Sequence, residues 1–270
     1  MPTSETDTWL QANVQFADSS TAEHGAVHHL APVLKDTRWF TMRKRAWRCR
    51  IALPADSDAA QALRSRVIRD LDRLTDAGRI SGWTRVVYEP ETRAFGGAAA
   101  MEAAHTLFCA DTRHLIRFLA AGGERPDRRR EVSLLLCHTL LRAAELDPFE
   151  QGDVWDRVAA TRVLPSGAPP SARIQRQVHG LLSVEPGPAG PHFADGGAFA
   201  GFSAWAQSFQ TCGQRVAALN AGGRLTRGLR AVLAHHVIFH WNRLGIVTED
   251  QAVLAHAAAR TAFAPETAAL

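Results

Sequence analysis

Cysteine is scarce in this sequence, and the cysteines present are widely spaced. Cys49, Cys109, Cys137 and Cys212 have none of the close pairing found in zinc ribbons and redox motifs. We therefore expect reduced, mostly buried thiols, and we expect no cysteine-based metal site.

Long apolar runs are missing as well. No stretch reaches the roughly 18 consecutive apolar residues that a membrane-spanning helix needs. The start, from Met1 to Asp7, is polar and acidic, and it lacks the basic and apolar regions of a secretory signal. The sequence predicts a soluble, cytoplasmic protein with no membrane partner.

Charge is nearly balanced, with a formal net charge of +4, but one segment is strongly basic. Its basic residues, opposed only by Asp36, are Lys35, Arg38, Arg43, Lys44, Arg45, Arg48 and Arg50. Such a cluster favours an anionic partner, either nucleic acid or an acidic peptide. A solvated strand face is the plain alternative.

The first third of the chain alternates between strand and helix patterns. The expected strands are Trp9–Phe16, Arg38–Arg43, Trp47–Leu53 and Trp83–Tyr88, and the expected helices run from Thr21 to about Leu34 and from Asp56 or Ser57 to Gly78. In the third strand, apolar residues alternate with Arg48 and Arg50, so both arginines share one face. This order predicts a ferredoxin-like βαββαβ sandwich over residues 1–95.

Helical spacing dominates residues 96–270. The expected helices are Ala98–Ala120, Arg128–Ala144, Ala172–Leu182, Phe199–Leu219, Arg227–Leu244 and Thr248–Ala262, interrupted by Gly- and Pro-rich loops at Pro165–Pro170 and Glu185–Gly197. The fold class is therefore α+β, with a ferredoxin-like portion followed by a mainly helical one. We expect the two portions to pack together as one functional unit.

Two histidines lie on the apolar stripe of the helix Arg227–Leu244. His236 and His240 are one turn apart, which suits either a pair of core residues or a site for proton transfer. His24 and His28 repeat the spacing, but no third metal ligand is identifiable near either pair. We predict no metal and no cofactor.

An acidic turn follows the last predicted strand. Tyr88, Glu89 and Glu91 precede Phe95, Gly96 and Gly97, at the start of a helix where free backbone N–H groups gather. His105 lies on the apolar face of that helix and suits the core equally well. A basic sheet face, an acidic turn and a histidine helix could form an acid–base site or a groove for an acidic peptide.

Three blocks of sequence resemble the thiopeptide-type bacteriocin biosynthesis family, which is similar to the C-terminal elimination domain of class I lantibiotic dehydratases. They are WFTMRKRAWRCRI at Trp39–Ile51, YEPETRAFGGAAAMEAAHTLF at Tyr88–Phe108 and HHVIFHWNRLG at His235–Gly245. The resemblance implies one of two chemistries. Some members remove glutamate from glutamylated Ser or Thr; others, the pyridine synthases, join two dehydroalanines in a formal [4+2] cycloaddition, aromatise the ring and expel the leader peptide.

The two chemistries differ at the acidic turn. Elimination domains are similar to one another in having an arginine three residues after a glutamate; here these positions are Glu91 and Ala94, and Arg93 lies one residue early. Elimination needs a cation or strong donor for the enolate, which alanine cannot supply. The resemblance therefore favours a stand-alone pyridine synthase, a lyase or cyclase.

The resemblance also implies residue roles. Tyr88 and Glu91 would stabilise the iminol form of the reacting amide, and His236 and His240 would move protons during the later losses of water and leader carboxamide. The expected substrate contacts are Arg43, Arg48, Arg50, Arg93, His105, Asn242 and Arg243. The first three would contact a precursor peptide with an acidic leader.

Two other functions remain open. In the first, a stand-alone elimination domain uses Arg48, Arg50, Arg93 and His236 beside a partner dehydratase subunit. In the second, a non-catalytic subunit only binds the leader peptide. RNA binding is disfavoured because the aromatic signature of a ribonucleoprotein sheet is missing from the sequence.

Overall fold

The structure is a computed structural model that describes residues 8–44, 46–122, 127–164, 167 and 169–263. Met1 to Asp7, and positions 165, 166 and 168 of the predicted loop Pro165–Pro170, lie outside the described residues. The chain forms two compact units, one of residues 1–90 and 108–126 and the other of residues 91–107 and 127–270.

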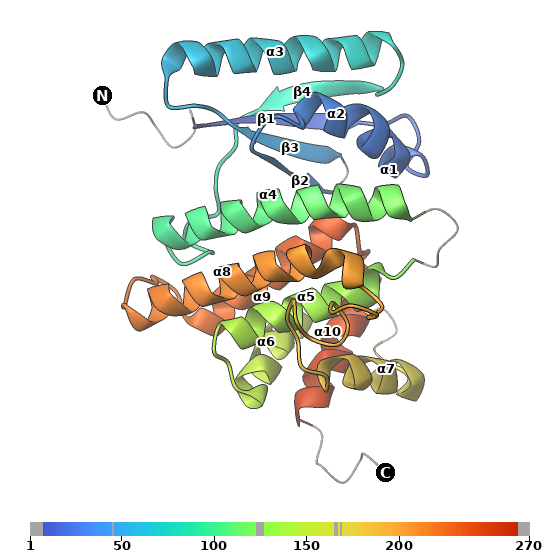
Figure 1. The fold of residues 1–270 in the computed structure, drawn as a ribbon, viewed down its shortest axis with the longest axis vertical. Helices are drawn as coiled ribbons and strands as arrows, with labels where there is room; N and C mark the ends of the chain where they lie inside the picture. The colour runs from blue at the N-terminus through green and yellow to red at the C-terminus, as the bar shows by residue number, and fades with distance from the viewer. Residues whose placement is uncertain (1–7, 45, 123–126, 165–166, 168, 264–270) are drawn as a thin grey trace. The chain divides into compact units, whose positions relative to one another are not determined.

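The first unit contains a four-stranded antiparallel sheet (Figure 1). Its strands are β1 (Trp9–Gln15), β2 (Trp39–Arg43), β3 (Trp47–Ala52) and β4 (Gly82–Val86), in the spatial order β2-β3-β1-β4. This is the order of a split βαβ sandwich, so the predicted ferredoxin-like fold is confirmed. The fourth strand ends before Tyr88, because the chain turns away from the sheet after Val86.

Two helical segments connect the strands of the first unit. The first comprises α1 (Ala22–Gly25), a π-helical turn η2 (Ala26–Leu30) and α2 (Ala31–Leu34); the second is α3 (Ser57–Asp76). Helix α3 begins at the predicted position because the side chain of Asp56 accepts a hydrogen bond from the backbone N–H of Ala59, at 2.7 Å. Residues 108–121 of helix α4 (Ala98–Ala121) also belong to this unit.

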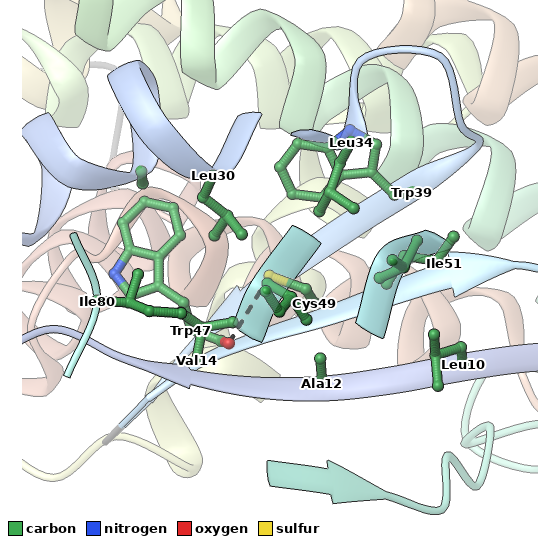
Figure 2. Close-up of a cluster of buried hydrophobic side chains, with 13 residues drawn as sticks. Leu10, Ala12, Val14, Leu30, Leu34, Trp39, Trp47, Cys49, Ile51 and Ile80 are labelled. Carbon is green, nitrogen blue, oxygen red and sulfur yellow. Dashed lines mark hydrogen bonds between the residues drawn. The ribbon is translucent and has the colours of Figure 1, made fainter. Parts of the chain in front are cut away.

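One face of the sheet forms an apolar core with these helices (Figure 2). The strand register pairs Leu10 with Ile51, Ala12 with Cys49 and Val14 with Trp47, and all six side chains are buried. The intervening pairs are Gln11 with Arg50 and Asn13 with Arg48. Because side chains alternate between the faces of a strand, Arg48 and Arg50 share the opposite face, as predicted.

The second unit is helical, as expected for this half of the chain. It contains the first part of α4, α5 (Arg129–Ala143), α6 (Pro148–Ala160), α7 (Ala172–Leu182), a 3-10 turn η3 (Ala200–Phe202), α8 (Ser203–Ala221), α9 (Leu229–Leu244) and α10 (Thr248–Phe263). Helix α6 was not predicted. Its start is a capping box, in which Asp147 and Glu150 each accept a backbone N–H of the other.

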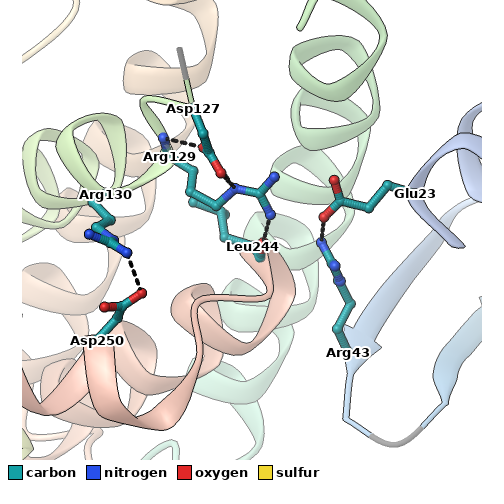
Figure 3. Close-up of polar contacts among 7 residues, drawn as sticks. All are labelled: Glu23, Arg43, Asp127, Arg129, Arg130, Leu244 and Asp250. Carbon is teal, nitrogen blue, oxygen red and sulfur yellow. Dashed lines mark hydrogen bonds and ion pairs between the residues drawn. The ribbon is translucent and has the colours of Figure 1, made fainter. Parts of the chain in front are cut away.

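The C-terminal end of α9 is fixed by α5. Gly245 ends the helix in the left-handed region, at φ 72°, and Arg129 donates a hydrogen bond to the carbonyl oxygen of Leu244 at 3.0 Å (Figure 3). An ion pair of 2.7 Å joins Arg130 of α5 to Asp250 of α10. The Arg129 contact holds the histidine-bearing helix α9 at its last turn.

The cysteines of both units are buried and form no disulfide bond. Burial raises the pKa of the Cys49 and Cys212 thiols to about 12, so both stay protonated at neutral pH. The prediction of reduced, buried thiols is confirmed. Across the described ranges, none of the helices has the length and apolar character needed to cross a membrane.

Two helical glycines give a matched test of helix packing in the second unit. A Cβ added to Gly213 in α8 would lie 2.5 Å from the carbonyl oxygen of Leu140 in α5, whereas one added to Gly180 in α7 meets no atom within 4 Å. We expect Gly213→Ala to lower the free energy of unfolding by about 1–3 kcal/mol. Gly180→Ala should raise it by up to about 1 kcal/mol. Urea denaturation measures both, and equal effects would contradict the close α5–α8 approach.

Candidate functional site

The turn from Glu91 to Gly97 is a tight structure built on two glycines with positive φ. Gly96 and Gly97 have φ angles of 86° and 107°, and the N–H of Gly97 donates to the carbonyl oxygen of Thr92 at 2.8 Å. A Cβ on Gly96 would lie 3.0 Å from the Val232 side chain. Both the backbone conformation and the close approach to α9 therefore require glycine here.

The segment before α9 holds this turn in place. The backbone N–H of Thr226 donates to the carbonyl oxygen of Gly96 at 3.0 Å, and the Arg227 guanidinium donates to the carbonyl oxygen of Ala94 at 2.6 Å. A cation from a distant part of the sequence thus contacts the backbone of Ala94, the residue that stands where the family pattern has an arginine.

Phe95 joins the turn to the side of α9. It is fully buried, and its ring meets those of His235, His236 and Phe239 edge-on, with centroids 4.9, 4.9 and 5.0 Å away. Each such contact contributes about 0.5–1.5 kcal/mol beyond the burial of its area. Phe95 therefore fixes which face of α9 is directed toward the turn.

Glu91 and His235 form a hydrogen-bonded pair across this contact. The distance from Nε2 of His235 to Oε2 of Glu91 is 2.8 Å, and the side chains are 21% and 51% exposed, respectively. A carboxylate that accepts a hydrogen bond from an imidazole orients the ring for proton transfer, and imidazole is the side chain best suited to that role near neutral pH. Glu91 was predicted from the sequence as a catalytic residue, and His235 was not.

His236 and His240 are core residues of the second unit. They are 1% and 0% exposed, and the ring of His240 packs edge-on against Phe209 at 4.8 Å. Burial, followed by electrostatic interactions with Arg243 and His235, lowers the pKa of His236 to about 3, so this ring is neutral at physiological pH. Their catalytic roles stay predictions.

The remaining predicted contacts of the second unit are spread over three places. Arg93 is exposed on the turn, and His105 is 4% exposed in α4, with Nδ1 3.8 Å from a carboxylate oxygen of Glu102. Arg243 is fully buried in α9. Asn242 accepts a hydrogen bond from Gln251 at 3.1 Å, which connects α9 to α10. The substrate-binding roles of these four residues stay predictions.

In the first unit, Tyr88 is packed against an arginine. The Arg50 guanidinium lies 4.5 Å from the centre of the Tyr88 ring and 5.3 Å from that of Phe40, and its Nε donates to Gln11 at 2.8 Å. Tyr88 is 5% exposed, and its ring also meets that of Trp9 at 5.9 Å. A guanidinium above an aromatic ring is an attractive arrangement that orients both groups. The predicted cooperation of Tyr88 with Glu91 stays a prediction.

The three strand arginines lie on two faces of the sheet. Arg48 shares the Arg50 face, whereas Arg43 pairs with Trp47 in the register and lies on the core side. Arg43 is bound to Glu23 at 2.5 Å (Figure 3) and lies over the Trp47 ring at 4.8 Å. Its charge is therefore already paired with a carboxylate.

His24 and His28 form the second histidine pair noted in the sequence. The rings of His24 and His28 lie 4.3 Å apart. Among the described residues, however, there is no cluster of three or more His, Cys, Asp or Glu side chains that could hold an ion.

The fold and the site define an α+β protein in which a ferredoxin-like sandwich precedes a helical half that carries a glutamate–histidine pair. The sequence model of one family, described as the lantibiotic biosynthesis dehydratase C-terminal family, matches residues 9–262. The chain belongs to this family. No curated protein sequence matches it significantly.

Several solved structures share this fold. The tRNA-dependent lantibiotic dehydratase MibB from Microbispora sp. 107891 aligns with a TM-score of 0.69 and 18% identity, over 97% of this chain but only 28% of MibB. TsrL aligns with a TM-score of 0.55 and 16% identity, over 94% of this chain and 93% of TsrL. TbtD, the pyridine synthase from thiomuracin biosynthesis, aligns with a TM-score of 0.61 and 13% identity, over 94% of this chain and 97% of TbtD. At these identities, the likeness shows the fold alone.

Proposed function

We propose that this protein is a pyridine synthase that acts on a dehydrated ribosomal peptide with an acidic leader. It would join two dehydroalanines in a formal [4+2] cycloaddition, aromatise the ring and release the leader. The observation that carries the proposal is the accessible Glu91–His235 pair, in a turn where Ala94 replaces the arginine of the elimination domains.

The pair suits the proton transfers of this reaction. One amide must pass its N–H proton to a base while its carbonyl oxygen receives a proton, which gives the iminol form that acts as azadiene. Two new C–C bonds then close the ring, and losses of one water and of the leader carboxamide make it aromatic. Glu91 and His235 can supply one base and one acid at a single location.

Much of the acceleration would come from geometry. Holding two alkenes of one peptide in register contributes up to roughly 7–11 kcal/mol in favourable cases. The glycine turn, the Phe95 contacts and the fixed last turn of α9 support a rigid setting for the pair. His236 then has a positioning role, since its neutral ring packs against Phe95.

The fold suits this branch, because the pyridine synthase TbtD shares it. Arg48, Arg50 and Arg93 are the proposed contacts for the acidic leader, because each carries a charge at a partly or fully exposed position.

Glutamate elimination is the second candidate, and one observation favours it. The Arg227 guanidinium at the Ala94 carbonyl brings a cation back to the turn, where it could stabilise an enolate. In that case, the protein would work beside a separate dehydratase subunit that attaches glutamate.

Mass spectrometry of a precursor peptide incubated with the protein separates the candidates. With a dehydroalanine-containing peptide, we expect a macrocycle and a free leader carboxamide. Loss of glutamate from a glutamylated peptide would instead support elimination. Binding of the peptide without conversion of either form would overturn both and favour a leader-binding subunit.

Arg227→Met gives a second, independent test. If the protein is a pyridine synthase, we expect less than a tenfold fall in turnover, since the methionine removes one hydrogen bond to the turn. If elimination is the reaction, removal of the enolate cation should cost about 10²- to 10³-fold. Initial rates on the competent peptide provide the measurement, and Arg224→Met, at a neighbouring exposed position, is the control.

A further inference from the structure

The second unit contains a cavity that the proposed reaction does not use. It has a volume of about 390 Å³ and lies among α5, α6, α7 and α10. This is within the size range of small-molecule sites. None of the residues of the Glu91–His235 site lines it.

The cavity combines an apolar wall with two opposite charges. Leu182, Val184 and Ala262 line the cavity and are partly exposed, so they supply apolar surface. Arg142 of α5 and Glu185, which follows α7, line the same space, and both are exposed. No ion pair joins these two within the described part of the chain, so each charge remains available to a ligand.

His138 is the second observation that points to a ligand. It lines the cavity one turn before Arg142, is only 6% exposed, and its Nδ1 has no hydrogen-bond partner among the described residues. This nitrogen is covered by protein atoms, so a ligand would reach His138 through another part of the ring. Burial, and then the charge of Arg142, lowers the pKa of His138 to about 4, so the ring is neutral and can donate to or accept from a bound group.

We infer that this cavity binds a free α-amino acid with an apolar side chain. The carboxylate would bind Arg142, the ammonium group would bind Glu185, and the side chain would pack on the apolar wall of Leu182, Val184 and Ala262. A simple anion would be repelled by Glu185 and a simple cation by Arg142, so a zwitterion is the class that satisfies both charges. The ring of His138 would complete the polar contacts.

Isothermal titration calorimetry with L-phenylalanine, L-tryptophan and L-leucine tests the inference on the full chain. We expect saturable binding of at least one of them. Arg142→Gln and Glu185→Gln should each weaken it by about tenfold or more, because each removes a charge-assisted hydrogen bond. Arg157→Gln and Asp156→Asn, at exposed positions of α6 outside the cavity, should leave it unchanged.

Two analogues make the test specific. The parent protein should prefer L-phenylalanine to both 3-phenylpropionate, which lacks the ammonium group, and phenethylamine, which lacks the carboxylate. Glu185→Gln should abolish the first preference and Arg142→Gln the second. Absence of saturable binding, equal binding of an analogue by the parent, or unchanged affinity in both variants would overturn the inference. Peptide turnover is not part of the readout, so the result does not depend on the proposed function.

Discussion

Replacing Glu91 with glutamine is expected to lower the rate of peptide conversion by about 10²- to 10⁴-fold, the contribution typical of a positioned acid or base. Glutamine keeps the size of the side chain and can still accept a hydrogen bond from His235, but it cannot take up a proton. His235→Gln should have an effect of similar size, since it removes the other member of the 2.8 Å pair. Single-turnover mass spectrometry measures both rates.

The double variant and a nearby control sharpen this test. Because the two side chains act as a unit, Glu91→Gln combined with His235→Gln should be little slower than either single variant. Glu89→Gln, an exposed carboxylate two residues earlier, should keep the parent rate. Affinity for the leader peptide should not change. Single-variant rates within twofold of the parent would exclude the pair from the mechanism.

The same assay, applied to variants of the buried histidines, has a different expected result. His236→Ala and His240→Ala remove rings that are 1% and 0% exposed, so loss of packing should accompany any loss of macrocycle formation. If turnover is unchanged in both variants, neither ring takes part in the reaction. If His236→Ala slows turnover but leaves its pH profile unaltered, the positioning role is supported.

Acidification from pH 6.5 to 5 is expected to lower the free energy of unfolding by about 3–4 kcal/mol through two histidines alone. The pKa values of His138 and His236 are lowered from 6.5 to about 4 and about 3 by burial. Below pH 6.5 the unfolded chain binds protons at both rings while the folded chain does not. The contribution of these two rings to the free energy of unfolding is therefore fully present above pH 6.5. It decreases as the pH falls toward the pKa values of the rings in the folded state.

Variants assign this loss to particular rings. His138→Gln and His236→Gln should each reduce the slope of stability against pH by about 1.4 kcal/mol per pH unit at most. His179→Gln, at an exposed position, should leave the slope unchanged. Burial also lowers the pKa of His114, which adds to the loss in the same direction. Urea denaturation at pH 7, 6 and 5 gives the slopes, and a flat profile for the parent would contradict burial of neutral histidines.

The sheet could be predicted from sequence because its signals are local. Alternation of apolar residues with Arg48 and Arg50 defined the two faces of β3, and the structure confirms them. The side of the sheet on which Arg43 lies depends on the pairing of β2 with β3, which the residues of β2 alone do not determine.

Helix α6 was missed although its start carries a readable signal. Asp147, Pro148 and Glu150 make a capping box with proline in the first turn, a pattern typical of helix N-termini. The glycine and the mixture of polar and apolar residues after it weakened the periodicity that served as the main guide.

His235 was missed for a tertiary reason. Helix α9 is apolar on most of its surface, so its sequence does not show which side is covered and which remains accessible. The partner that selects His235 is Glu91, 144 residues away, and Phe95 sets the rotation of the helix. The role of Arg227 could not be predicted for the same reason, because its contact with the Ala94 carbonyl has no signature in the neighbouring sequence.

Residues 98–107 of helix α4 belong to the second unit, and residues 108–121 belong to the first unit. A gene fragment ending at residue 95 would thus lose Phe108, which packs on Phe40 at 5.3 Å, and Thr112, whose hydroxyl accepts the Thr41 N–H at 3.1 Å on edge strand β2. A strand edge that no other element covers can pair with strands of other chains. Recombination between relatives should accordingly tolerate crossovers after residue 126 better than crossovers at residue 95.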